Sequence, residues 1–276
     1  MRNASPLRYP GGKWRLGHFF QQLLALNFDQ APTYLEAYAG GASLALSLLF
    51  SGDVSEIFLN DLDPAIYAFW HAVLNRTQAL IALVKKTAVT PREWRRQKEI
   101  YVTGPAAGPL RLGFATFFLN RTNHSGILNG GMIGGKEQSG DWKLDARFNR
   151  SELISRIKRI GAYREHIHLS NIDAADFIRS HKGSSNKLLY LDPPYYRPGH
   201  LYLNTYGPDD HVQVRNQVLG LDCKWVVSYD DVPEIRRLYK HQPSRRVELL
   251  HTARAARRGK EVIFFSSELR IPILTR

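Results

Sequence analysis

The sequence predicts an α/β domain built on a largely parallel sheet. Two observations support this class. Short apolar runs typical of buried strands alternate with longer segments of helical periodicity, and polar residues suited to ligand binding follow directly after several of those runs. The 276 residues and 43% hydrophobic content are enough for one good-sized core with a smaller subdomain.

Six runs are predicted to be strands: 33–36, 56–60, 166–170, 187–191, 224–228 and 261–266. Helices are predicted at 14–26, 42–50, 64–74, 174–180, 210–219 and 233–239. Pro233 suits the start of the last helix, because the first turn makes no use of the N–H that proline lacks.

One region interrupts the alternation. Residues 70–160 are predicted to be helices around a stretch rich in glycine and asparagine, 120–140, with no buried strand. Glycine and asparagine supply the positive φ angles of hairpins and loops. We therefore expect a discontinuous sheet domain of residues 1–69 and 161–276, with residues 70–160 as a mainly helical insert.

The composition favours a polyanionic partner in a reducing compartment. The formal charge is +13, and residues 236–260 carry nine basic side chains against one acidic side chain. Neutralising phosphates with such residues drives nucleic-acid binding, although a solvated face explains any single cluster equally well. No apolar run approaches the ~20 residues that span a bilayer. The single cysteine, Cys223, excludes an intramolecular disulfide framework, and we expect a cytoplasmic protein.

The strongest local signal is Asp192-Pro193-Pro194-Tyr195, directly after an apolar strand. Ligands in open α/β sheets bind outside the carboxyl ends of the strands. The two prolines remove N–H donors, which leaves a carboxylate and carbonyl oxygens as acceptors for an exocyclic amine. Tyr195 offers a face on which a planar base can stack. A plain turn after the strand is the alternative for this tetrapeptide taken alone.

Two further turns are candidate ligand sites. The segment 36–43 (Glu-Ala-Tyr-Ala-Gly-Gly-Ala-Ser) leads from a strand through glycines into a helix, and Asp61 follows the next strand at the interval where an acid binds ribose in dinucleotide folds. Together they favour a nucleoside-type cofactor, although Asp61 alone could be a helix cap. At the N-terminus, Tyr9-Pro10-Gly11-Gly12-Lys13 could present N–H groups and a cation to a carboxylate, or be only a turn.

In this order, RYPGGK, EAYAGGAS, LNDLDP and DPPY closely resemble the Dam-type, α-class DNA adenine-N6 methyltransferases. The resemblance covers nearly the whole chain. It implies a Rossmann-like S-adenosylmethionine-dependent methyltransferase sheet domain. It also implies that the insert between the second and third strands is a target-recognition domain.

The resemblance also implies roles for particular residues. Tyr9 and Lys13 would contact S-adenosylmethionine, with Lys13 near its carboxylate. Glu36, Tyr38 and Gly40 would surround the methionine part, and Asp61 would hold the ribose. Asp192 would hold the target amine beside the methyl donor, and Pro193, Pro194 and Tyr195 would complete the catalytic motif. Asp173 is the candidate contact after the third strand, although Asp176 is an equal match and Asp173 could simply cap a helix.

Residues 120–126 look like the family's entry to its recognition hairpin, so Arg121, Asn123 and His124 are candidate base readers. In the alternative, Asn120 and Asn123 stabilise the turn and Arg121 meets a phosphate.

The predicted reaction is site-specific methylation of adenine N6 in duplex DNA after base flipping, with no metal. The predicted location is the cytoplasm, in association with the nucleoid, for a protein of bacterial, archaeal or phage origin. An RNA adenine-N6 methyltransferase and an inactive DNA-binding relative are the alternatives. The recognition sequence, a partner restriction endonuclease and the oligomeric state stay open.

Overall fold

The structure is a computed structural model that describes residues 4–8, 13–183, 186–196, 206–251 and 257–273, except the side chains of 249–258. Within these residues seven strands form one sheet in the order β3-β2-β1-β4-β5-β7-β6. In chain order the strands are β1 Thr33–Glu36, β2 Glu56–Asn60, β3 Ile167–Ser170, β4 Lys187–Leu191, β5 Lys224–Asp230, β6 Ser244–His251 and β7 Arg257–Phe265. Strands β1 to β5 are parallel, which confirms the predicted sheet, and β7 runs antiparallel to both β5 and β6.

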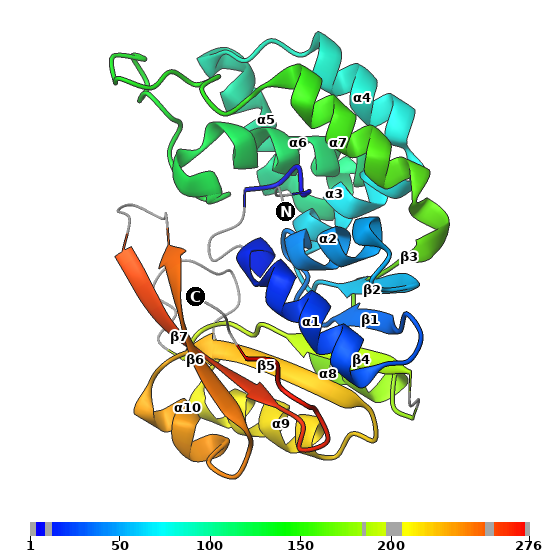
Figure 1. The fold of residues 1–276 in the computed structure, drawn as a ribbon. Coiled ribbons are helices and arrows are strands. Elements are labelled where there is room, and N and C mark those ends of the chain that lie inside the picture. Colours follow the sequence, from blue (N-terminus) through cyan, green and yellow to red (C-terminus); the bar gives the residue numbers. More distant parts are fainter. Residues whose placement is uncertain (1–3, 9–12, 184–185, 197–205, 252–256, 274–276) are drawn as a thin grey trace.

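Helices cover both faces of the sheet (Figure 1). The 3-10 turn η1 Lys13–Leu16, α1 Gly17–Asn27 and α2 Ser43–Ser51 lie on one face. On the other lie α8 Ala174–Ser180, α9 Pro208–Leu219 and α10 Pro233–Leu238. Successive side chains of β4 point to opposite faces of the sheet. Leu188 and Tyr190 belong to the hydrophobic cluster on one face, whereas Leu189 and Leu191 belong to the cluster on the other.

The chain between β2 and β3 is helical. It forms α3 Pro64–Asn75, α4 Thr77–Lys86, α5 Pro91–Thr103, α6 Pro109–Thr122 and α7 Arg150–Ala162, with 3-10 turns η2 Gly104–Ala107, η3 His124–Gly126 and η4 Arg164–His166. Within residues 61–166, all of which the structure describes, the β pairing is limited to an isolated bridge between Asn123 and Met132. The predicted absence of a strand is therefore confirmed, and the division into two domains stays a prediction. None of the described helices is long and apolar enough to cross a membrane.

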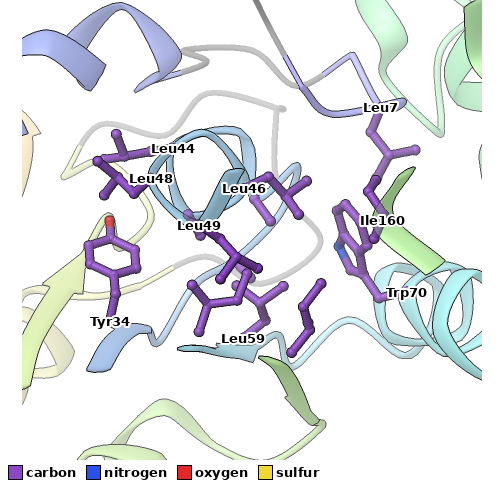
Figure 2. Close-up of a cluster of buried hydrophobic side chains, with 14 of the residues drawn as sticks. Leu7, Tyr34, Leu44, Leu46, Leu48, Leu49, Leu59, Trp70 and Ile160 are labelled. Carbon is purple, nitrogen blue, oxygen red and sulfur yellow. The ribbon is translucent and has the colours of Figure 1, made fainter. Parts of the chain in front are cut away.

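Helix α2 joins the sheet to this helical region. It is apolar nearly all round, as expected for a helix buried on several sides. Figure 2 shows its leucines beside Tyr34 and Leu59 of the sheet, and also near Trp70 and Ile160 of the helices between β2 and β3. All these residues belong to one hydrophobic cluster, so the sheet and the helical region share a core.

One strand was absent from the sequence prediction. Residues 244–251 read only as part of a basic stretch, but they form β6, paired in register with β7 from Ser244↔Phe264 to His251↔Arg257. Arginines and a glutamate interrupt the apolar pattern of β6 because it is the edge strand, where charge hinders pairing with other chains.

Candidate active site

The predicted Asp192 motif follows β4, which lies between β1 and β5 near the middle of the sheet. The Asp192 side chain is 27% exposed, so it is accessible at the carboxyl edge of the sheet. Its Oδ1 accepts a hydrogen bond from Ser228 Oγ of β5 at 2.8 Å. The Tyr190 hydroxyl lies 2.8 Å from the same Ser228 oxygen and supplies the donor on its other side. The neighbouring strands therefore hold the carboxylate in a fixed orientation.

Lys13 contacts the same carboxylate. Its Nζ lies 3.1 Å from Asp192 Oδ1, and 3.0 and 2.9 Å from the two carboxylate oxygens of Glu261 on β7. Burial alone lowers the pKa of Lys13, but the two carboxylates more than offset this and raise it, so the side chain is a cation. The predicted contact between Lys13 and a cofactor carboxylate stays a prediction. In this structure the ammonium binds two carboxylates of the protein.

Burial acts in the opposite sense on Asp192. It raises the pKa of that carboxyl and nearby Glu261 raises it further, whereas Lys13 and the bond from Ser228 lower it. Lys13 therefore favours the ionised form of Asp192, the form that can accept hydrogen bonds from an amine.

The glycine turn after β1 is closed by Asp61. Gly40 and Ala42 both have left-handed φ angles, 46° and 45°. The Gly40 N–H donates to Asp61 Oδ2 at 2.8 Å, and the N–H of Asp63 donates to Asp61 Oδ1 at 2.9 Å. The indole of Trp70 donates to the Gly40 carbonyl at 2.9 Å, which ties α3 to the turn. Burial raises the pKa of Asp61 to about 7. The glycine turn and Asp61, both predicted as cofactor contacts, are joined by a direct hydrogen bond, and their contact with a cofactor stays a prediction.

Glu36 ends β1 and is buried beside this turn. The Tyr34 hydroxyl donates to Glu36 Oε1 at 3.1 Å. Burial raises the pKa of Glu36 to about 8, although the bonds from Tyr34 and from the backbone of Ala45 oppose this. The carboxyl ends of β1, β2 and β4 thus present three partly desolvated acidic groups: Glu36, Asp61 and Asp192.

Tyr38 and Asp173 lie on the α8 side of the site. The hydroxyls of Tyr38 and Tyr206 are 3.0 Å apart. Burial raises the pKa of Tyr38, and both Tyr206 and the Asp173 charge add to the effect, so Asp173 lies within electrostatic range of this pair. Asp173 also caps α8 by accepting from Ala175 N at 2.8 Å, whereas Asp176 pairs with Arg179. The capping alternative is present, and the charge of Asp173 acts on both tyrosines; a contact of Asp173 with a cofactor stays a prediction.

The predicted base readers fall into different environments. Asn123 is fully buried. Its amide donates to the carbonyls of Ile127 (2.8 Å) and Leu128 (3.0 Å), and its Oδ1 accepts from Trp94 Nε1 at 2.6 Å. This burial replaces the base-reading role predicted for Asn123 with a turn-stabilising one. His124 is exposed, and its role stays a prediction.

Arg121 lies in a group of guanidinium side chains. Its Nε donates to the Arg147 carbonyl at 2.7 Å. Burial and the charges of Arg8, Arg156 and Arg147 lower its pKa to about 9, against a smaller opposite effect of Glu152. Arg8 is held nearby because its backbone N–H and carbonyl both bond to the side chain of Asn120, each at 2.7 Å.

Tyr9 lies outside the described residues. Of the other predicted residues, Lys13 contacts Asp192, Lys13 and Tyr195 both contact Glu261, and Gly40 is joined to Asp61. The sequence prediction missed Glu261, Ser228, Tyr206 and Arg8. A signal for Glu261 existed, because it is a lone carboxylate at the start of an apolar strand. Its partner Lys13, however, is 248 positions away.

The strand order, with an antiparallel β7, a glycine turn after β1 and an acidic motif after β4, defines a Rossmann-like S-adenosylmethionine-dependent methyltransferase. The sequence matches the model of the D12 class N6 adenine-specific DNA methyltransferases over residues 9–254. The chain therefore belongs to this family.

Among solved structures the chain has distant matches. A ribosomal RNA methyltransferase, AviRa from Streptomyces viridochromogenes, is 15% identical with a TM-score of 0.43, over 93% of this chain and 85% of that one. TrmN from Thermus thermophilus is 12% identical with a TM-score of 0.39, over 88% of this chain and 47% of that one. A search of curated proteins gave no match.

Proposed function

We propose that this protein transfers the methyl group of S-adenosylmethionine to adenine N6 in duplex DNA, with the target base flipped out of the helix. The observation that carries the proposal is the Asp192 carboxylate, which is partly exposed after β4, paired with Lys13 and oriented by a hydrogen bond from Ser228. Pro193 and Pro194 follow it without N–H groups, so the motif offers the amine only acceptors.

The chain's contribution is orientation and charge. S-adenosylmethionine, when bound, supplies a methyl group already activated on a sulfonium. Asp192 accepts a hydrogen bond from the N6 amine, which aims the nitrogen lone pair at the methyl carbon. It also stabilises the positive charge that grows on nitrogen as the nitrogen–carbon bond forms and the carbon–sulfur bond breaks, before the nitrogen loses a proton to solvent. An adenine inside a duplex cannot reach such a pocket, so the target base must be flipped out of the helix. Tyr195 offers a ring on which the flipped base can stack.

The residues present fit this cofactor. S-adenosylmethionine carries a sulfonium and an α-ammonium, and the edge of the sheet presents the three acidic groups Glu36, Asp61 and Asp192. Desolvated carboxyl groups with raised pKa values gain most from a neighbouring cation. We assign Asp61 to the ribose and Glu36, Tyr38 and Gly40 to the methionine part.

Cofactor binding should strengthen as pH rises from about 6 to about 8. Glu36 and Asp61 have pKa values raised to about 8 and about 7, so both lose protons as the pH rises over this range. A bound cation favours the ionised form of Glu36, and ribose hydroxyls that donate hydrogen bonds favour the ionised form of Asp61. Each proton released on binding makes affinity rise by up to about tenfold per pH unit. Calorimetric titration of wild type and Asp61→Asn over this range measures the effect.

The cofactor's own amino group contributes equally to the pH dependence of both proteins, so its contribution cancels when the two slopes are compared. Asp61→Asn should show a shallower pH dependence. Identical slopes for the two proteins would remove Asp61 from the cofactor site.

The cluster of arginine side chains around Arg121 supports a nucleic-acid substrate. The charges of Arg8, Arg147 and Arg156 all act on the partly buried Arg121, and Arg156 itself pairs with Glu152. An anion would relieve the repulsion on Arg121. Phosphates of a nucleic-acid backbone are suitable anions, because guanidinium groups bind them with paired hydrogen bonds. We therefore assign Arg121 to a phosphate rather than to a base.

Arg121→Ala should weaken binding about equally on the cognate site and on all its single-base variants. Fluorescence anisotropy at fixed salt measures this, and the dependence of affinity on salt should also become shallower. His124→Ala, an exposed neighbour on the same turn, is the matched comparison. Relaxed preference at one base position in Arg121→Ala would instead make Arg121 a base reader.

The reaction itself is tested by supplying duplex DNA, single-stranded DNA and RNA with labelled cofactor, then identifying the modified nucleoside by mass spectrometry. We expect N6-methyladenine in duplex DNA. Methylation confined to RNA, or at another base, would contradict the proposal. Sequencing the genome of an expression host that lacks adenine methylation then gives the recognition sequence.

A further inference from the structure

A buried ion cluster joins the two ends of the chain beneath the proposed amine site. Lys13, near the N-terminus, and Glu261, on the last strand, are 5% and 1% exposed. Lys13 Nζ binds both oxygens of Glu261, and the third contact of the ammonium goes to Asp192 Oδ1 at 3.1 Å. One cation is thus shared between two carboxylates, so the position of Lys13 depends on Glu261 as well as on Asp192.

Glu261 also holds the other end of the motif. The Tyr195 hydroxyl donates to Glu261 Oε1 at 2.8 Å. The Lys13 Nζ lies 5.7 Å from the centre of the Tyr195 ring. A single carboxylate therefore contacts both the lysine that binds Asp192 and the tyrosine proposed to stack on the base.

The strand register explains how β7 reaches the motif. Glu261 pairs with Asp230 across the antiparallel β5–β7 ladder. Asp230 in turn accepts a hydrogen bond from the backbone N–H of Tyr196 at 3.0 Å. Tyr195 and Tyr196 are thus fixed by two carboxylates that stand opposite each other in the sheet. Strand β7 lies outside the four sequence motifs, but its Glu261 side chain fixes the position of Tyr195 at the end of the DPPY segment.

We propose that Glu261 is a positioning residue for methyl transfer, holding Lys13 on Asp192 and the Tyr195 ring at a fixed place beside it. The inference rests on the proposed function, since it concerns the same amine and base. It adds a third element to the motif: the end of β4 supplies the acceptor, the N-terminal turn supplies the cation, and β7 sets the distance between acceptor and ring.

Glu261→Gln should lower turnover by about 10- to 100-fold, because small misplacements of reacting groups cost rates of that order. Cofactor affinity should stay within about threefold, since Glu261 contacts the motif rather than the glycine turn. Glu248→Gln, which changes an exposed carboxylate on the same hairpin, is the matched control and should behave as wild type. Wild-type turnover in Glu261→Gln would overturn the inference.

The pH profile separates positioning from a merely structural role. Asp192 is faced by Lys13 from η1, Glu261 from β7, and Ser228 from β5; Tyr190, Glu36 and Tyr34 also lie within electrostatic range. Because the Glu261 charge raises the pKa of Asp192, removing it should move the acidic limb of the rate profile to lower pH. An unmoved limb, with activity lost only through unfolding, would overturn the inference.

A stability cycle tests the same contacts without activity. Lys13→Met leaves the buried Glu261 and the partly exposed Asp192 without their cation and should lower the melting temperature. Adding Glu261→Gln to Lys13→Met should recover part of that loss, although Glu261→Gln alone is destabilising. If Glu261→Gln lowers the melting temperature equally in both backgrounds, the ion cluster is absent and the inference fails.

The two levels of proposal fail differently. Wild-type protein that methylates no adenine defeats the proposed function. Wild-type activity together with a fully active Glu261→Gln defeats only the role of Glu261.

Discussion

Asp192→Ala should lose nearly all methyl transfer while keeping its fold and its cofactor. The carboxylate interacts mainly with the reacting amine, so its loss falls on the transition state and not on the ground state. We expect turnover to drop by about 10²–10³-fold or more, by comparison with the removal of one stabilising group at other active sites. Cofactor affinity should stay within about tenfold.

The fold should survive because the remaining charges balance. With Asp192 removed, Lys13 still has Glu261 as a partner at 2.9 Å, so no buried ion is left alone. Asp192→Asn keeps an acceptor without the charge and should be intermediate in turnover. Asp176→Ala, at an exposed carboxylate paired with Arg179, is the control and should be fully active. Near-wild-type turnover in Asp192→Ala, with a normal melting temperature, would show that the amine is held elsewhere.

Gly113→Val should destabilise the protein by about 3 kcal/mol or more, and Gly113→Ala by about 1–3 kcal/mol. Gly113 lies on α6 where that helix crosses α3. A Cβ at this position would lie 2.4 Å from the Ala68 carbonyl oxygen and 2.8 Å from its carbon. These are backbone atoms of a buried helix, so relief requires the two helices to move apart.

The higher helix propensity of alanine would by itself stabilise the protein by about 1 kcal/mol relative to glycine. The sign of the stability change therefore distinguishes the close packing of the two helices from helix propensity alone. Chemical denaturation measures the free energy of unfolding. Gly131→Ala is the matched control, because a Cβ there meets nothing within 4 Å. A Gly113→Ala protein more stable than wild type would mean that α3 and α6 are packed less closely than the structure shows.

Much of the fold was predictable from local sequence. The parallel strands were predicted from short apolar runs, and the predicted bounds of β1, β2 and β4 agree with the observed ones. This succeeded because a buried parallel strand must be apolar on both faces, which leaves a continuous signal. The edge strand β6 was missed for the opposite reason. Most of its described side chains are exposed, and the sequence mixes arginines with apolar residues, so the local pattern carries little information.

The candidate site divides in the same way. Asp192, Asp61 and Gly40 could be found from the sequence because each follows a predicted strand, and parallel strands bring their carboxyl ends to one edge. Asn123 was predicted to be a base reader because of its residue type. Only the packed structure shows that its side-chain amide already forms hydrogen bonds with Trp94 and with two backbone carbonyls.

The sequence by itself determined the order of strands and helices, the helical region after β2 and the acidic motif after β4, since each depends on neighbours along the chain. Only the tertiary structure decided that Lys13 and Tyr195 meet at Glu261. That contact depends on β7 turning antiparallel to β5 and on the register that sets Glu261 opposite Asp230. A shift of one residue would turn Glu261 to the other face of the sheet. The residue pattern within β7 does not indicate which side chains Glu261 contacts.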